Sequence, residues 1–170
     1  GEPASTVVNN TESWNGTNWT EVNNLNTVRF RNSGFGADNT AAVCFGGSTG
    51  PAVTANTELW NGTNWTEVNN LNTAREDLAG AGISTAGLGF GGAAPSLTGA
   101  TEEWNGTNWT EVADLATARK ELAGAGTSTN ALAIGGSDPG YSAATEERST
   151  GAPVGAWSTG TNINTARQYV

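Results

Sequence analysis

A nearly identical segment occurs three times in this 170-residue chain, and tandem repetition constrains the fold more than any other feature. The segment Thr11–Val22 returns almost unchanged as Thr57–Val68 and Thr101–Val112, and a degraded fourth copy starts at Thr145. The second tryptophan of each copy marks a period of 46, 44 and 48 residues, at Trp19, Trp65, Trp109 and Trp157. A unit of this length cannot bury both of its faces alone, so neighbouring copies must stack on one another.

Each unit contains four short segments with the period-two patterning and turn punctuation of strands. The expected strands of the third unit are 121–128, 131–135, 144–148 and 156–161, and those of the second unit are 78–84, 87–91, 100–104 and 109–115. Between the last two of these, Asn105 and Gly106 favour a tight turn. We therefore predict an all-β fold, a β-propeller of four-stranded antiparallel blades of about 44–48 residues. One domain spans 1–170, with repeat copies at approximately 1–29, 30–75, 76–119 and 120–167.

The composition fits this fold and excludes some partners. The chain has 24 glycines and 7 tryptophans but only 14% charged residues, as expected of strands and turns with a polar, weakly charged surface. A net charge of −9 repels nucleic-acid phosphates and anionic lipid, so we expect no nucleic-acid partner and no membrane insertion. With no apolar run of about 20 residues, the chain is expected to be soluble. The single cysteine, Cys44, lies in an apolar run and is expected in the core.

A recurrent order of residues resembles the kelch repeat over nearly the whole chain. Each unit has a glycine pair after an apolar strand, then an aromatic residue, a tryptophan, a Leu or Ile six residues later, and an arginine. The glycine pairs are Gly46-Gly47, Gly91-Gly92 and Gly135-Gly136. This resemblance implies a propeller with the glycine-pair strand near its axis. The copies are also similar to repeat proteins encoded by marine bacteriophages, which implies a virion-associated or extracellular location.

Two other blade types compete with the kelch interpretation. WD-type repeats have a similar length but rely on a histidine, and this chain has none. Sialidase-type Asp boxes place Ser, Asp, Gly, Thr and Trp on a blade turn, and residues 13–19 nearly match that pattern without its acid. A sialidase-like or other glycan-processing propeller enzyme is therefore the alternative function.

One glutamate and one arginine recur in every unit. The glutamates are Glu12, Glu58, Glu102 and Glu146, and the arginines are Arg29, Arg75, Arg119 and Arg167. Both residue types are costly to bury unless they are paired. They could form a ring of ligand-binding charges, but we favour Arg–Glu bridges within or between blades.

The recurrent tryptophans pose a similar choice. Exposed tryptophans can stack on sugars, but tryptophans at fixed positions on every blade more often fill the gap between sheets, which is the role we predict. Small residues in the first strand of a unit, as in 78–82 and 122–126, would let sheets approach closely near a narrow axis.

The sequence offers little for catalysis. It has no histidine for a general base near neutral pH, no metal-ligand cluster and no serine or cysteine with a candidate partner base. Carboxylate pairs occur at 76–77, 102–103 and 146–147, but neighbouring strand residues point to opposite faces, so the last two pairs are poorly placed to converge on one bond. We therefore predict a protein that is not an enzyme and has no cofactor.

A uniform framework with loops that differ between copies favours a binding or assembly role. The loops after the glycine pairs are 48–53, 93–98 and 137–142, and Asp138 and Tyr141 are the candidate ligand contacts. Expected partners are other protein subunits, further repeats of the same protein, or a cell-surface glycan. The competing class is a structural connector of a virus particle that binds only protein. The repeat phase also predicts three complete inner hairpins for four outer ones, so the chain is either a segment of a longer protein or is completed by another chain.

Overall fold

The computed structural model describes residues 7–149 and 156–163. These residues form 14 strands and no helix. No helix that could cross a membrane occurs among them. Among the predicted repeat residues, Arg167 lies outside the described part of the chain.

The strands form one two-stranded hairpin and three four-stranded antiparallel sheets. The hairpin consists of β1 (Thr11–Trp14) and β2 (Trp19–Val22). Sheet 1 consists of β3 (Ser33–Asp38), β4 (Ala41–Phe45), β5 (Thr57–Trp60) and β6 (Trp65–Val68). Sheet 2 consists of β7 (Ala79–Ile83), β8 (Ala86–Phe90), β9 (Thr101–Trp104) and β10 (Trp109–Val112). Sheet 3 consists of β11 (Ala123–Gly126), β12 (Ala131–Ile134), β13 (Thr145–Arg148) and β14 (Trp157–Thr159). The prediction of repeated four-stranded antiparallel sheets is confirmed.

Strands follow one another in sequence order within each sheet, and equivalent residues pair in the same register. The threonine that opens the third strand of each sheet pairs with the last residue of the second strand: Thr57 with Phe45, Thr101 with Phe90, and Thr145 with Ile134. The three sheets therefore share one pattern of residue pairs, apart from a register shift between Gly36 and Asp38 in sheet 1.

Most of the predicted strands are longer than the observed ones, and two of the largest differences have a clear cause. The strand expected at 121–128 is β11, which spans Ala123–Gly126. Glu121 has a φ of 56° and Gly126 a φ of 103°, so the extended conformation is interrupted at both ends. The strand expected at 109–115 ends at Val112, because the chain turns there and Asp114 accepts a hydrogen bond from the backbone N–H of Thr101.

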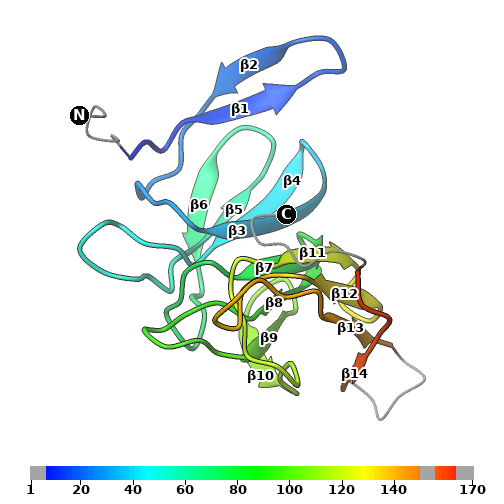
Figure 1. Cartoon of the computed structure of the whole chain (residues 1–170). Coiled ribbons are helices and arrows are strands. Elements are labelled where there is room, and N and C mark those ends of the chain that lie inside the picture. Colours follow the sequence, from blue (N-terminus) through cyan, green and yellow to red (C-terminus); the bar gives the residue numbers. More distant parts are fainter. Residues whose placement is uncertain (1–6, 150–155, 164–170) are drawn as a thin grey trace.

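The three sheets stack face to face in the manner of propeller blades (Figure 1). Their closest contacts are between the first strands, β3 with β7 and β7 with β11. A Cβ built on Gly124 would lie 2.4 Å from the carbonyl oxygen of Gly80, so only glycine allows this approach of β11 to β7. The first strands make the closest contacts between sheets because their small residues permit close packing, as predicted, and the strand before the glycine pair lies beside the first strand.

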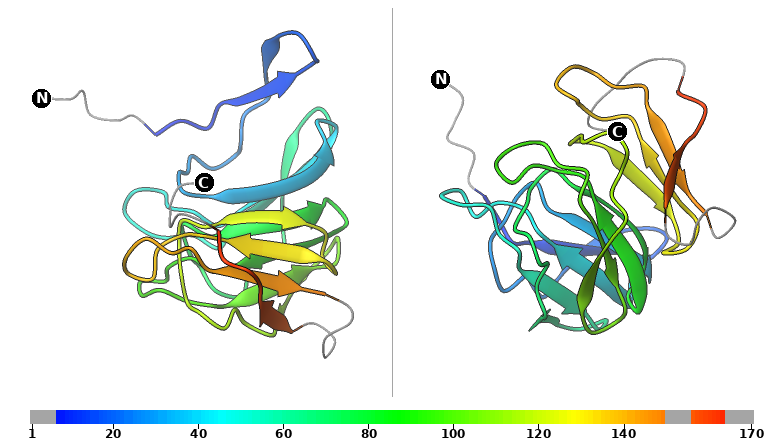
Figure 2. Two further views of the ribbon diagram at one scale, coloured as in Figure 1. Left: turned by 45° about the vertical axis from the view of Figure 1, so that its right-hand side comes forward. Right: turned by 90° about the horizontal axis from the view of Figure 1, so that it is seen from below.

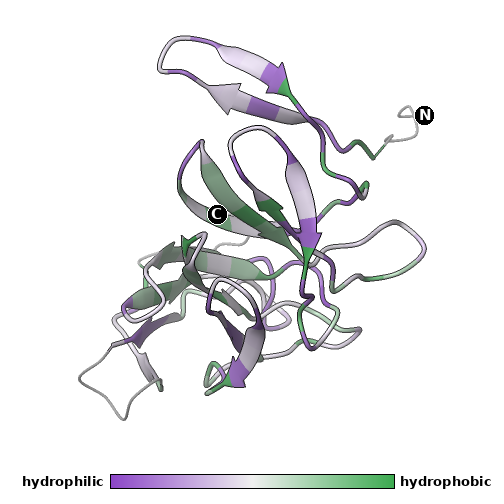
Figure 3. Ribbon diagram, turned by 180° about the vertical axis from the view of Figure 1, so that it is seen from behind, coloured by the Kyte–Doolittle hydropathy of each residue, from purple (hydrophilic) through white to green (hydrophobic). Residues whose placement is uncertain are grey.

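The described sheets do not close a circle. Hairpin β1–β2 lies at one end of the series and sheet 3 at the other, and no hydrogen bond joins them (Figure 1). Apolar residues are concentrated on the inner strands, whereas hairpin β1–β2 is largely polar (Figure 3).

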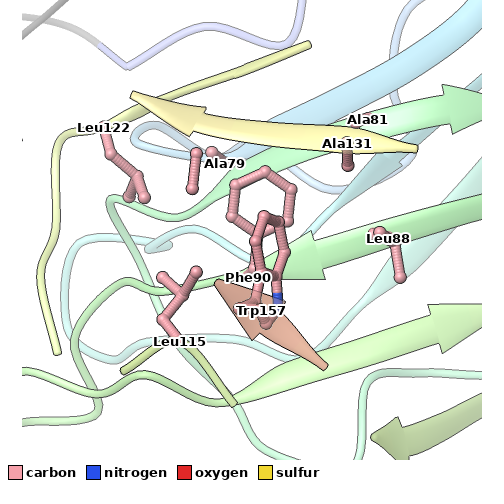
Figure 4. Close-up of a cluster of buried hydrophobic side chains, with 9 residues drawn as sticks. Ala79, Ala81, Leu88, Phe90, Leu115, Leu122, Ala131 and Trp157 are labelled. Atoms are coloured by element: carbon pink, nitrogen blue, oxygen red, sulfur yellow. The ribbon is translucent and has the colours of Figure 1, made fainter. Parts of the chain in front are cut away.

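Aromatic rings fill the spaces between sheets. Phe90 of sheet 2 and Trp157 of sheet 3 have ring centroids 4.9 Å apart, and aliphatic side chains from both sheets surround them (Figure 4). Between sheets 1 and 2, Phe45 and Trp109 are also 4.9 Å apart. Cys44 is buried as predicted, and Asn32 donates a hydrogen bond to its sulfur at 3.2 Å.

Candidate functional site: the loop face

The repeated arginines and glutamates form ion pairs that cross from one repeat to the next. The pairs are Arg29–Glu58, Arg75–Glu102 and Arg119–Glu146, and their side chains are at most 3% exposed. The prediction of buried Arg–Glu bridges is confirmed for these three pairs, and the bridges lie between repeats. Buried and paired, these charges are structural and are not available to an external ligand.

Each of these glutamates also binds the turn that carries its arginine. Glu102 accepts hydrogen bonds from the backbone N–H and the side-chain amide of Asn72, at 2.7 and 2.8 Å. Arg75 donates to the carbonyl oxygens of Gly91 and Gly89 as well as to Glu102. The bridge therefore fixes the linker of one repeat against the sheet of the next.

Glu12, the first glutamate of the series, differs from its equivalents. Glu12 is exposed and makes no ion pair with any described residue. Its equivalents pair with the arginine of the preceding repeat, and no described sheet precedes hairpin β1–β2.

The second tryptophan of a repeat packs against the preceding repeat in three of four copies. The indole N–H groups of Trp65, Trp109 and Trp157 donate to the hydroxyls of Thr11, Thr57 and Thr101 at 3.0, 3.0 and 3.2 Å. Trp109 and Trp157 are buried, as predicted. For Trp19 the prediction is wrong: it is 64% exposed, because no described sheet faces that side of its hairpin.

The loops that follow the glycine pairs all leave the sheets at the same end, and we call this end the loop face (Figure 2). The loop face comprises residues 46–56, 91–100 and 135–144. Each loop is closed by one isolated bridge, Ser48 with Val53, Ala93 with Leu97, and Ser137 with Tyr141. The framework is therefore similar in all three loops, with one more residue in the first, while the closing residue changes from valine to leucine to tyrosine.

The two predicted contact residues lie together on the third of these loops, but they differ in accessibility. Tyr141 is 67% exposed, the largest exposed fraction among the large apolar side chains described. Asp138 is half-buried, and its carboxylate accepts a hydrogen bond from Ser142 at 3.2 Å. Tyr141 is thus free to contact a partner, whereas Asp138 shapes the loop.

A charged network near the inner strands was not predicted. Arg31, Asp77 and Glu121 occupy equivalent positions, two residues after the repeated arginines, and each has a φ of 55–56°. The backbone N–H of Asp77 donates to the carbonyl of Arg31 at 3.0 Å, and that of Glu121 donates to Asp77 at 2.8 Å. Left-handed backbone at residues other than glycine is costly and often accompanies functional sites. No sequence signal marked these positions, because three different residue types occupy them.

Side chains of the network form a ladder of alternating charge. The carboxylate of Asp77 is 3.3 Å from Nζ of Lys120 and 3.8 Å from Nε of Arg31. Lys120 also lies 3.0 Å from Glu121, and this hydrogen bond is the main cause that raises the pKa of the lysine, with Asp77 adding to it. The side chains of Arg31 and Lys120 are 48% and 31% exposed, so both cations remain accessible to solvent.

The described residues contain no group of three or more His, Cys, Asp or Glu side chains placed to hold a metal ion. The chain matches no protein-family model and no curated protein. The loop face is therefore defined by its geometry alone: a repeated framework and three loops with different closing residues.

Proposed function

We propose that this chain is a non-enzymatic binding module, a kelch-like propeller that recognises a glycan or a protein through its loop face. The observation that carries this proposal is the similar bridging of three loops whose closing side chains differ, Val53, Leu97 and Tyr141. A rigid framework that presents different side chains at equivalent positions is the usual design of recognition surfaces. Tyrosine is the most frequent anchor among such residues, because it offers a large contact area and a polar tip.

The setting that we propose is a virion or another extracellular surface, where the module takes part in host recognition or particle assembly. The resemblance to kelch-like repeat proteins of marine bacteriophages supports this setting. The acidic net charge of −9 agrees with a partner other than nucleic acid.

Binding of the fluorescently labelled chain to a panel of bacterial cells tests this function. We expect wild type to bind at least one strain and Tyr141→Ala to lose most of that binding. Ile83→Ala is the matched control, because Ile83 is 44% exposed at the end of β7 opposite the loop face. Pretreatment of the cells with periodate removes a glycan target, and pretreatment with a protease removes a protein target. Equal binding by wild type and Tyr141→Ala would contradict the role of the loop face.

A glycan-processing enzyme is distinguished in the same experiment. A binding module leaves the released cell-surface glycans unchanged in mass after prolonged incubation. Shortened glycans that accumulate with time would contradict the non-enzymatic proposal.

A further inference from the structure

The outward face of sheet 3 contains a buried hydroxyl without a partner. Thr145 is equivalent to Thr57 and Thr101, whose hydroxyls accept hydrogen bonds from the tryptophan of the following repeat. Thr145 is only 8% exposed, and its Oγ1 atom has no hydrogen-bond partner among the described residues. Leaving a buried polar group unsatisfied costs free energy, so this atom is placed for a donor from outside the described sheets.

The apolar residues around Thr145 are also uncovered. Leu132 is 37% exposed, whereas its equivalents in sheets 1 and 2, Val43 and Leu88, are 1% and 0% exposed. Ile134 pairs with Thr145 and lies on the same face as Leu132, two residues away along β12. A cavity of about 230 Å³ opens beside Leu132 and Glu147. This face therefore has the features of a blade interface without the facing blade.

Hairpin β1–β2 presents the complementary features. Trp19 is 64% exposed, its ring lies 5.5 Å from that of Trp14, and Glu12 beside them has no ion pair among the described residues. Residues 14–22 are identical in sequence to residues 104–112, which carry the tryptophan that docks on sheet 1. The hairpin thus exposes the kind of indole N–H donor that Thr145 of sheet 3 lacks.

We propose that hairpin β1–β2 of one chain docks on the open face of sheet 3 of a second copy of the same chain. The Trp19 ring packs on Ile134 and Leu132, and its indole N–H donates to Thr145 Oγ1, as Trp157 does to Thr101 within the chain. The occupant is a second copy because the described chain exposes Trp19 while its Thr145 has no donor among the described residues, so each chain carries both complementary surfaces. This surface is separate from the loop face, so the inference does not depend on the proposed function.

The contact is heterologous, joining one surface of a chain to a different surface of its neighbour. Such contacts generate closed rings or open filaments, depending on the rotation between copies. Either product would display the loop faces of several copies together, which raises avidity for a repetitive surface.

Mass measurement by light scattering or sedimentation tests the proposal on the full chain. We expect the wild-type mass to rise above the 17.3 kDa monomer as concentration increases. Trp19→Ala removes the hairpin surface and Leu132→Arg blocks the sheet 3 surface, so each variant alone stays monomeric. An equimolar mixture of the two variants forms a dimer and nothing larger, because one intact surface remains on each. Ile83→Arg is the matched control and associates like wild type.

Thr145→Val separates docking from folding. Valine keeps the shape of threonine and removes the unpartnered oxygen, so the isolated chain keeps its melting temperature or gains a few degrees. Association weakens by roughly 2- to 10-fold, the equivalent of one hydrogen bond.

Three results would overturn the proposal: a wild type that is monomeric at every concentration, a variant mixture that forms no dimer, or a Trp19→Ala chain that associates normally. A monomeric wild type whose cell binding depends on Trp19 would instead identify the hairpin as a glycan-stacking surface, and would also overturn it.

Discussion

Arg75 donates a hydrogen bond to Glu102 at 3.0 Å across the boundary between two repeats, and both side chains are almost completely buried. Burial lowers the pKa of the arginine, and the Glu102 carboxylate acts in the opposite direction. The same bridge occurs at each boundary between consecutive repeats in the described chain, so one contact type joins every blade to its neighbour.

Removing one partner of this bridge should strongly destabilise the fold. Arg75→Ala leaves the Glu102 carboxylate buried without its cation, and we expect the free energy of unfolding to fall by roughly 3–5 kcal/mol. Chemical denaturation followed by tryptophan fluorescence measures this loss. Glu111→Ala removes an exposed carboxylate from the strand that pairs with that of Glu102, and should change stability by no more than about 0.5 kcal/mol. Comparable stability losses for the two substitutions would show that the buried bridge stabilises the fold no more than an exposed carboxylate does.

The tryptophans give a matched pair of variants at equivalent positions. Trp109→Phe leaves the buried Thr57 hydroxyl without its donor, and should destabilise the chain by about 1–3 kcal/mol. Trp19→Phe changes a side chain that is 64% exposed, and should be close to neutral in dilute solution. The difference in thermal midpoint between the two variants is the readout. A larger effect at Trp19 than at Trp109 would be inconsistent with the described packing.

The close approach of the inner strands predicts a steric effect. In Gly124→Ala the new methyl group would lie 2.4 Å from the carbonyl oxygen of Gly80, so the strands must separate. We expect a loss of roughly 1–3 kcal/mol in denaturant unfolding. Gly140→Ala is the control, because a Cβ at that loop position meets nothing within 4 Å. Equal stability of the two variants would argue against tight packing of β11 on β7.

Burial of the Cys44 thiol should make the stability of the fold depend on pH. Burial raises the pKa of this thiol from 9.0 to about 11, so the folded chain holds this proton more tightly than the unfolded chain. The stabilising contribution is therefore fully present below about pH 9 and is lost as pH rises through about 11. The stability difference between wild type and Cys44→Ala should shrink over that range. A thiol that reacts with a disulfide reagent at pH 8 as fast as free cysteine would contradict this burial.

The blade framework was predictable from the sequence because it depends on local patterns that repeat. Alternating residues, the Asn-Gly turn and the recurrent Arg and Glu pointed to strands and bridges that the structure contains. The exposure of Trp19 was not predictable, because it depends on which sheets lie beside hairpin β1–β2. The left-handed backbone at Arg31, Asp77 and Glu121 also escaped prediction, since Arg and Glu carry no turn signal at the equivalent positions and the hydrogen bonds that link these residues cross between neighbouring repeats.

A double-mutant cycle tests the stacking of repeats most directly. Arg75 and Glu58 belong to the same repeat, whereas Arg75 and Glu102 belong to consecutive repeats. We predict that alanine substitutions at Arg75 and Glu102 are strongly non-additive in the free energy of unfolding, with a coupling of about 1–3 kcal/mol. Substitutions at Arg75 and Glu58 should be additive within about 0.5 kcal/mol. Coupling of Arg75 to Glu58 in place of Glu102, or additivity in both cycles, would contradict the packing of each repeat on the next.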